Sequence, residues 1–337
     1  PTNVMNTVIR NSVQLICIWL TLWLVAPGAQ AQQADPSLIA TTDRYEFHSN
    51  FWVNLHHFLY AQAKKPEDGK LPRGRSLSRA QWQAMNDAIT WYREHLADKD
   101  LLFDERMYDI KRALIRYEPD DVPDHAAVTE EHRARLEAAA RVYRNHYWPR
   151  HDHQNRTVWA WNESLIRALE NGVLDRIADL AQEPWPDGRI RVDLTWDANW
   201  AGAYCTTHPT HAVITSRQGG PDNSWPPGGW LELLFHEPSH ALIDPNNSAV
   251  AKAIAAAANE LGVEPPRGLW HGVLFYLSGS ATRDGLAAEG IEHSLLMHDE
   301  AIFSAYHEAL SASMPAYLAG DISLDEAMLR VVKVYLE

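Results

Sequence analysis

The stretch FHEPSHAL, residues 235–242, contains two histidines four positions apart, with a glutamate directly after the first. Residues four apart lie on one face of an α-helix, so His236 and His240 can present their imidazoles to a single ion. Glu237 is rotated by about 100° from His236 on a helix. That position suits a general base that takes a proton from a metal-bound water. The pattern His-Glu-x-x-His on a helix therefore predicts a zinc site.

One residue of this stretch conflicts with a regular helix. The apolar residues before and after the motif predict a single helix over 230–243. Pro238 lacks the N–H that would bond to the carbonyl of Leu234, a loss that costs about 3 kcal/mol or more in mid-helix. Either the helix kinks and keeps both histidines on the metal, or the site is distorted and weak. We expect the first outcome, because metal binding would offset the strain.

A zinc site of this kind needs a third protein ligand and an open position for water. His271 lies in GLWHGVLFYLSG, residues 268–279, an apolar segment that predicts a helix. A histidine buried there must find a partner, because an unsatisfied buried polar group is costly. Glu260, twenty residues after His240, is the second candidate. Two histidines nearer the N-terminus are further alternatives: His48 and His56.

The chain around the motif resembles the zincin metallopeptidases. The resemblance covers roughly residues 190–280, and in zincins an edge strand that binds extended substrate precedes the motif helix. The extended stretch 203–216 would then align a peptide by strand addition. In thermolysin-like zincins a glutamate on a later helix completes the metal site, which is the source of the Glu260 alternative. Four blocks also look like those of an uncharacterised family of exported bacterial proteins: FHSNFWVNLHHFLY, AGAYCTTHPTHAVITS, LELLFHEPSHAL and LWHGVLFYLSG.

Two tyrosines are predicted to complete the site. Tyr276, five residues after His271, is the candidate for stabilising an oxyanion, with a purely structural phenol as the alternative. Tyr204 lies in the extended stretch and is the candidate for binding substrate. Polar groups from the aromatic segment 45–63 are also expected at the pocket, and the sequence leaves open which of its histidines faces it: His48, His56 or His57.

The N-terminus reads as a targeting signal. Arg10 precedes an uncharged apolar run over 13–25, and Ala29-Gln30-Ala31 is a small-x-small cleavage site. A run of about 13 residues is too short to span a bilayer. Residues 1–31 are therefore predicted to be a signal peptide, and the bacterial protein to be periplasmic or secreted, with no stable membrane span after cleavage. Cys205 would be the only cysteine left, so no intramolecular disulfide is expected.

Hydrophobic periodicity divides the rest of the chain into two regions. A helical region over 32–183 precedes a zincin-like metal-binding region over 184–337, whose alternating segment 189–196 predicts a strand. The fold class expected is α+β, predominantly α-helical, with a small edge-stranded sheet, an active-site helix and an N-terminal helical layer. The helices predicted for the first region are 45–63, 78–96, 100–117, 132–148 ended by Pro149, and 158–171 closed by Gly172.

Charge and composition limit the classes of function that are expected. The net charge of −14 is spread out and no basic run occurs, so nucleic acid is not an expected partner. The best hypothesis is an exported zinc-dependent hydrolase, a metallopeptidase acting on a peptide or protein substrate. One alternative is a non-catalytic binding or scaffold protein with a degenerate zincin fold. Fourteen tryptophans leave a carbohydrate-active enzyme as another, without a paired-carboxylate constellation to support it.

Overall fold

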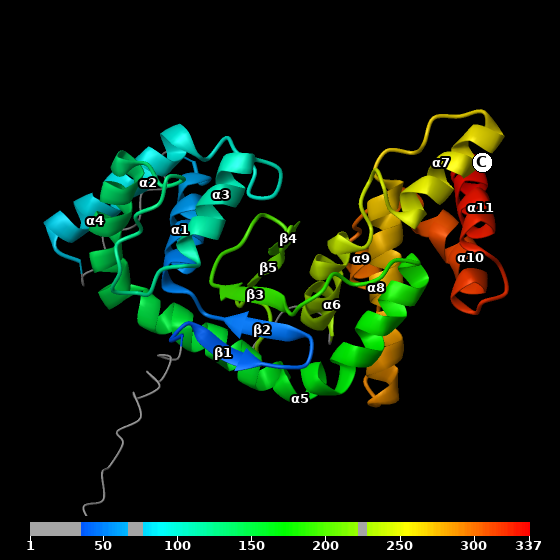
Figure 1. Cartoon of the computed structure of the whole chain (residues 1–337), viewed down its shortest axis with the longest axis horizontal. Helices are drawn as coiled ribbons and strands as arrows, with labels where there is room; N and C mark the ends of the chain where they lie inside the picture. Colours follow the sequence, from blue (N-terminus) through cyan, green and yellow to red (C-terminus); the bar gives the residue numbers. More distant parts are fainter. Residues whose placement is uncertain (1–34, 67–76, 222–227) are drawn as a thin grey trace, which may run out of the picture. The chain divides into compact units, whose positions relative to one another are not determined.

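The computed structural model describes residues 35–66, 77–221 and 228–337. The predicted signal peptide, 1–31, lies outside the described residues. Figure 1 shows a small sheet with helices packed against it, and the chain is α+β and predominantly α-helical, as predicted. None of the described helices combines the length and apolar character that crossing a bilayer requires.

The sheet has five strands in the order β1-β2-β3-β5-β4. The inner strands β2, β3 and β5 run parallel, and the edge strands β1 and β4 are each antiparallel to their neighbour. The strands are β1 (Leu38–Thr41), β2 (Tyr45–His48), β3 (Ile190–Thr195), β4 (Ala203–Thr207) and β5 (Thr210–Thr215). Both regions predicted from the sequence therefore contribute strands to one sheet, and residues 35–337 form one compact unit.

The helices fall into two groups along the chain. The first group is α1 (Phe51–Ala63), α2 (Arg79–His95), α3 (Glu105–Leu114), α4 (Glu130–His146) and α5 (Trp148–Ala181). The second group is α6 (Gly229–His236), the 3₁₀ helix η1 (Glu237–Ala241), α7 (Ala249–Leu261), α8 (Leu269–Ala288), α9 (Leu296–Asp299), the 3₁₀ helix η2 (Ser304–Tyr306), α10 (His307–Leu318) and α11 (Leu324–Leu336).

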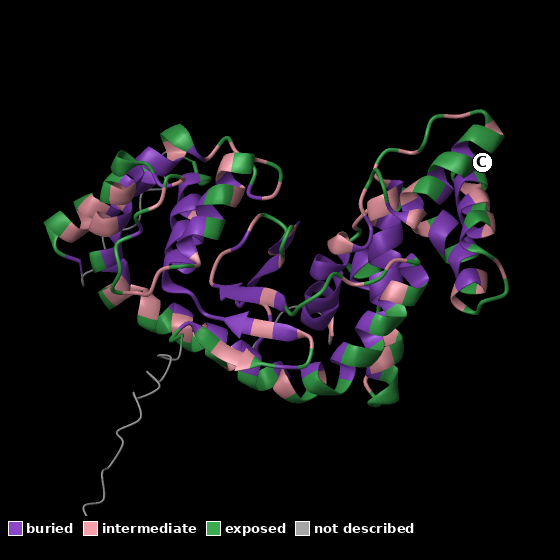
Figure 2. Cartoon of the chain, viewed as in Figure 1, coloured by how far each residue is buried: buried purple, intermediate pink, exposed green. Residues whose placement is uncertain are grey.

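The two faces of the sheet differ in chemistry, because successive side chains of a strand point to opposite faces. Val192 and Leu194 of β3 lie in an apolar core with α5, α6 and α8. Tyr204 of β4 and Val213 of β5 lie in a second core with α1 to α4. Asp193 lies between Val192 and Leu194 on β3 and is fully buried, so the second face of the sheet also buries a charged side chain. Figure 2 shows the strands as largely buried.

The predicted helix over 45–63 is wrong at its start. Residues 45–48 form β2, which pairs with β3, and α1 begins only at Phe51. The Asn50 side chain accepts a hydrogen bond from the N–H of Val53 and so caps the helix. Four residues are too few for periodicity to separate a strand from a helix, and the partner strand lies far away in the sequence.

The predicted helix end at Gly172 is also wrong. α5 continues from Trp148 to Ala181 and ends at Gln182, whose φ of 56° is left-handed. Pro149 does not simply end the preceding helix, because it occupies the first turn of α5, where its missing N–H costs nothing. Other bounds also differ from the prediction. The helix predicted over 100–117 is the shorter α3, and the apolar helix predicted over 269–279 extends to Ala288. The extended stretch 203–216 is a hairpin that turns at a cis His208–Pro209 bond.

Candidate metal centre

The helix that carries the motif changes type at Pro238. α6 ends at His236, and residues 237–241 continue as the 3₁₀ helix η1. The carbonyl of Leu234, which Pro238 cannot bond, instead accepts a hydrogen bond from the hydroxyl of Tyr45 at 3.5 Å. One residue on, the Ser239 hydroxyl donates to the carbonyl of Phe235 at 2.7 Å. The break in the α-helical ladder therefore leaves neither carbonyl without a donor.

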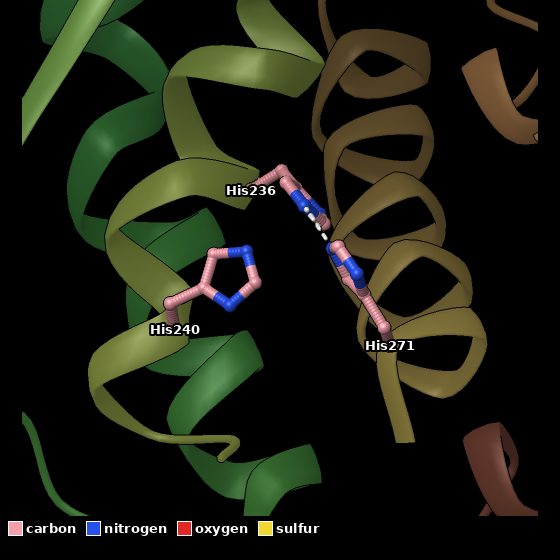
Figure 3. Close-up of side chains that lie close together, drawn as sticks. All are labelled: His236, His240 and His271. Atoms are coloured by element: carbon pink, nitrogen blue, oxygen red, sulfur yellow. Dashed lines mark hydrogen bonds between the residues drawn. The ribbon is translucent and has the colours of Figure 1, made fainter. Parts of the chain in front are cut away.

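Three histidines meet where this helix contacts α8 (Figure 3). His236 ends α6, His240 belongs to η1, and His271 lies in the first turn of α8. One ring nitrogen from each lies within 4.8 Å of the others. The Nε2 atoms of His236 and His271 are 3.4 Å apart. The described residues thus bring three imidazoles together in the number and spacing that a tetrahedral metal site uses.

A serine sets the tautomer of His236. Nδ1 of His236 lies 3.2 Å from the hydroxyl oxygen of Ser278. That hydroxyl donates its proton to the carbonyl of Leu274 at 2.8 Å, so it accepts a hydrogen bond from Nδ1–H. Nε2 of His236 then carries a free lone pair and faces His271. A partner on the other ring nitrogen is the usual way in which a metal-binding histidine is oriented.

Burial keeps the three imidazoles neutral. Loss of hydration is the largest effect on each; it lowers the pKa of His271 to about 4 and, with the neighbouring His271, that of His240 to about 3. The pKa of His236 is also held well below its ordinary value, first by burial and then by His240 and His271. Aromatic rings enclose the group, with Phe275 stacked on His236 at 3.7 Å. Near pH 7 the site therefore offers neutral nitrogen donors, the form that binds metal.

Glu237 lies directly beside the first histidine. Its side chain is buried, and burial raises the pKa of its carboxyl group to about 8. The Cys205 thiol is close enough to feel its charge. Burial first, and the Glu237 carboxylate second, raise the pKa of Cys205 to about 12, so this thiol stays protonated. Of the two groups, Glu237 is therefore the one that loses its proton closer to neutral pH and can then act as a base.

The other candidate ligands lie elsewhere. Glu260 is exposed near the end of α7, and this helix packs against α11. His48 contacts the Ser37 hydroxyl at 3.1 Å, and His56 contacts the Tyr92 hydroxyl at 3.0 Å. His57 is held between the carbonyl of Val53 and the hydroxyl of Tyr204, at 2.7 and 2.9 Å. Within the described residues, His271 is therefore the third member of the cluster.

The structure does not bring the two predicted tyrosines into this group. Tyr204 points into the second core, where its hydroxyl meets His57. Tyr276 lies about 140° around α8 from His271, and its ring packs against His298 at 6.5 Å. Of the six predicted site residues, the structure thus brings together His236, His240 and His271, and the buried Glu237 directly follows the first of them in the chain.

A cavity of about 440 Å³ opens beside the cluster, and His240 and His271 are part of its wall. Cys205, Thr206 and Thr207 of the edge strand β4 form a second side. The third side comes from the N-terminal region, with Phe103 in the turn before α3 and Tyr108 on α3. Sequence reasoning missed Phe103 because it assigned this residue to a helix. The available signal was a third consecutive apolar residue, after Leu101 and Leu102, directly before the polar Asp104.

Comparisons of the chain with protein-family models, with curated proteins and with solved structures found no match. Function is therefore inferred from the site alone.

Proposed function

We propose that this protein is a zinc-dependent hydrolase, and specifically a metallopeptidase. The observation that carries the proposal is the group of three neutral histidines, with one nitrogen from each within 4.8 Å; the buried Glu237 directly follows the first of them in the chain. A purely structural zinc site has no use for that carboxyl group, whereas a hydrolytic site needs a base.

The donor set fits zinc. His236 has a free lone pair at Nε2 because Ser278 occupies Nδ1, and the cavity reaches His240 and His271. His236, His240 and His271 would hold the ion and leave a fourth position open. A zinc ion held there would supply Lewis acidity toward water and toward a substrate carbonyl.

Residues of the chain would transfer the proton and position the substrate. Glu237 would accept a proton from the attacking water and pass it to the leaving amine. The edge strand β4 packs against η1, and its outer edge pairs with no strand among the described residues. An extended peptide could add to that edge and bring a carbonyl to the histidines. Export rests on the predicted signal peptide and would be tested by N-terminal sequencing of the mature protein.

The first experiment is elemental analysis of the purified protein. We expect about one zinc per chain, lost in His271→Ala and kept in the matched variant Glu260→Ala. A wild-type protein that takes up no zinc, even after zinc is added back, would overturn the proposal.

The second experiment tests the base. Glu237→Gln should retain zinc and lose peptide hydrolysis by roughly 10²–10⁴-fold, the usual contribution of general base catalysis. Zinc binding without hydrolysis of any peptide by the wild type would favour the alternative, a binding or scaffold protein. A panel of glycans serves as the control for carbohydrate activity.

A further inference from the structure

The cavity beside the histidines is mostly apolar. Its wall is rich in aromatic and aliphatic side chains: Leu102, Phe103, Tyr108, Ile243, Pro245 and Trp270. Among the described residues no lysine or arginine lines it, and the one acid is Asp244. A cavity of this composition recognises apolar groups by excluding water, and it would bury a charged group at a cost.

Phe103 is held in an exposed position by the backbone around it. The Asp100 carboxylate accepts hydrogen bonds from the N–H groups of Leu102 and Phe103 at 2.8 and 3.2 Å. Leu101, before this turn, is buried, and Asp104, after it, caps α3. The Phe103 side chain is nevertheless 83% exposed. An ordered turn therefore holds a large apolar side chain in the lining of the cavity, where a ligand could contact it.

Two walls of the cavity are fixed to each other. On α3, the Tyr108 hydroxyl donates to the carbonyl of His208, at the tip of the β4–β5 hairpin. One turn later, Lys111 Nζ donates to the Thr206 hydroxyl at 2.8 Å. These two bonds join α3 to β4 and to the tip of its hairpin. The cavity is therefore formed before any ligand binds, which lowers the entropic cost of binding.

The geometry points to a specificity site: the cavity accepts a large uncharged side chain, aromatic or long aliphatic, of a peptide next to the bond that is cut, and Phe103 selects it. This inference rests on the proposed function. Thr206 and Thr207 of β4 line the same cavity, so a peptide added to this strand edge would direct a side chain into it. Asp244 disfavours an acidic side chain, and the lack of further partners disfavours a basic one.

The test uses zinc-loaded protein and quenched fluorescent peptides that differ at one position, with Phe, Ala, Glu or Lys there. We expect kcat/KM for the Phe peptide to exceed that for the Ala peptide by at least about 10-fold, as pocket burial of a large apolar group allows. Phe103→Ala should reduce this ratio several-fold without changing zinc content. Trp200→Ala is the matched control, because Trp200 is also an exposed aromatic residue, 92% exposed, and it does not line the cavity. This variant should leave the ratio unchanged.

The outcomes separate this inference from the proposed function. Cleavage that favours the Glu, Lys or Ala peptide, or a Phe103→Ala variant with an unchanged ratio, would overturn the specificity site while the peptidase stands. If no peptide is cut, titration of the zinc-loaded Glu237→Gln variant with the same peptides decides. If the protein binds the Phe peptide selectively and Phe103→Ala abolishes that selectivity, the specificity site is supported even though no peptide is hydrolysed. Equal binding of all peptides, or no binding, would overturn it.

Discussion

A single hydroxyl group determines which ring nitrogen of His236 is free to bind a metal. Ser278 Oγ donates to the carbonyl of Leu274 and accepts from Nδ1 of His236, so only Nε2 is left to bind a metal. Hydrogen bonds of this kind fix both the ring orientation and the tautomer of a ligand.

Replacing Ser278 by alanine should therefore weaken zinc binding by roughly 10–100-fold, the usual effect of losing such a partner. The measurement is competition with a chelator of known affinity. Ser280→Ala is the control, since the Ser280 hydroxyl is also buried on α8 but has no hydrogen-bond partner among the described residues. Equal zinc affinity in both variants would mean that Ser278 does not orient His236.

Tyr45 compensates for the proline in the motif. Its hydroxyl donates to the Leu234 carbonyl, which would otherwise be left unbonded by Pro238. Tyr45→Phe should lower the free energy of unfolding by about 1 kcal/mol, the net worth of a buried hydrogen bond. In a Pro238→Ala background, where residue 238 can donate to Leu234, the same change should cost less. Urea denaturation of the four proteins gives the coupling, and a coupling of zero would contradict this account.

At the scale of elements, the approach of α6 to α8 brings His236 to His271. Gly279 permits that approach, because a Cβ atom there would lie 2.7 Å from Glu232 Oε1 on α6. Glu232 cannot easily move, since its other oxygen is bonded to His293 and to the N–H of Leu296, at 2.7 and 2.9 Å. The distance between two ligands of the proposed site thus depends on a glycine two turns away from His271.

Gly279→Ala should destabilise the protein by roughly 1–3 kcal/mol through overpacking, and it should weaken zinc binding by forcing α6 and α8 apart. Gly172→Ala is the opposite case, because a Cβ atom at this position in the middle of α5 meets nothing within 4 Å. That variant should gain about 0.5–1 kcal/mol from helix propensity. Thermal unfolding with and without zinc measures both. A Gly279→Ala protein as stable as the wild type would show that the helices are not in contact here.

At the scale of the whole molecule, α3 is joined to the sheet through a buried charge. Lys111 is 1% exposed, and its ammonium group donates to Thr206 of β4. Burial lowers the pKa of Lys111 to about 7; Cys205 and Asp193 oppose this shift, and Arg191 adds to it. The folded protein thus binds fewer protons than the unfolded chain above about pH 7, where a free lysine is still charged.

Lys111 should therefore make the protein more stable as the pH rises. The cost of burying the charged amine is fully present below pH 7 and disappears toward the unfolded pKa near 10.4. Relative to Lys111→Met, the wild type should gain about 2 kcal/mol of unfolding free energy between pH 7 and 9. Denaturant unfolding of both proteins at each pH cancels the titration of all other groups. If the difference in unfolding free energy between the wild type and Lys111→Met does not change with pH, the pKa of Lys111 lies near its ordinary value.

The features that could be predicted from the sequence are those that depend on local geometry alone. The spacing of His236 and His240 on one helix turn fixes their common face whatever the rest of the chain does, so two of the proposed ligands were readable from the sequence. The strand 190–195 was likewise evident from alternation. β2 and the long α5 were not, because β2 depends on pairing with β3 and α5 on packing that overrides the glycine at 172.

The class of fold, the two motif histidines and the neighbouring Glu237 are evident from the amino-acid sequence alone, since these depend on helix periodicity and residue chemistry. It takes the folded chain to show that His271, and not Glu260, lies beside the motif histidines, because both residues follow the motif at distances where helical spacing no longer constrains position. The fold also determines that Tyr45 supplies the donor that Pro238 lacks, and that Phe103 lines the same cavity as His240 and His271. Contacts between segments far apart in the chain are set by how apolar surfaces pack together, and that packing is a property of the whole fold.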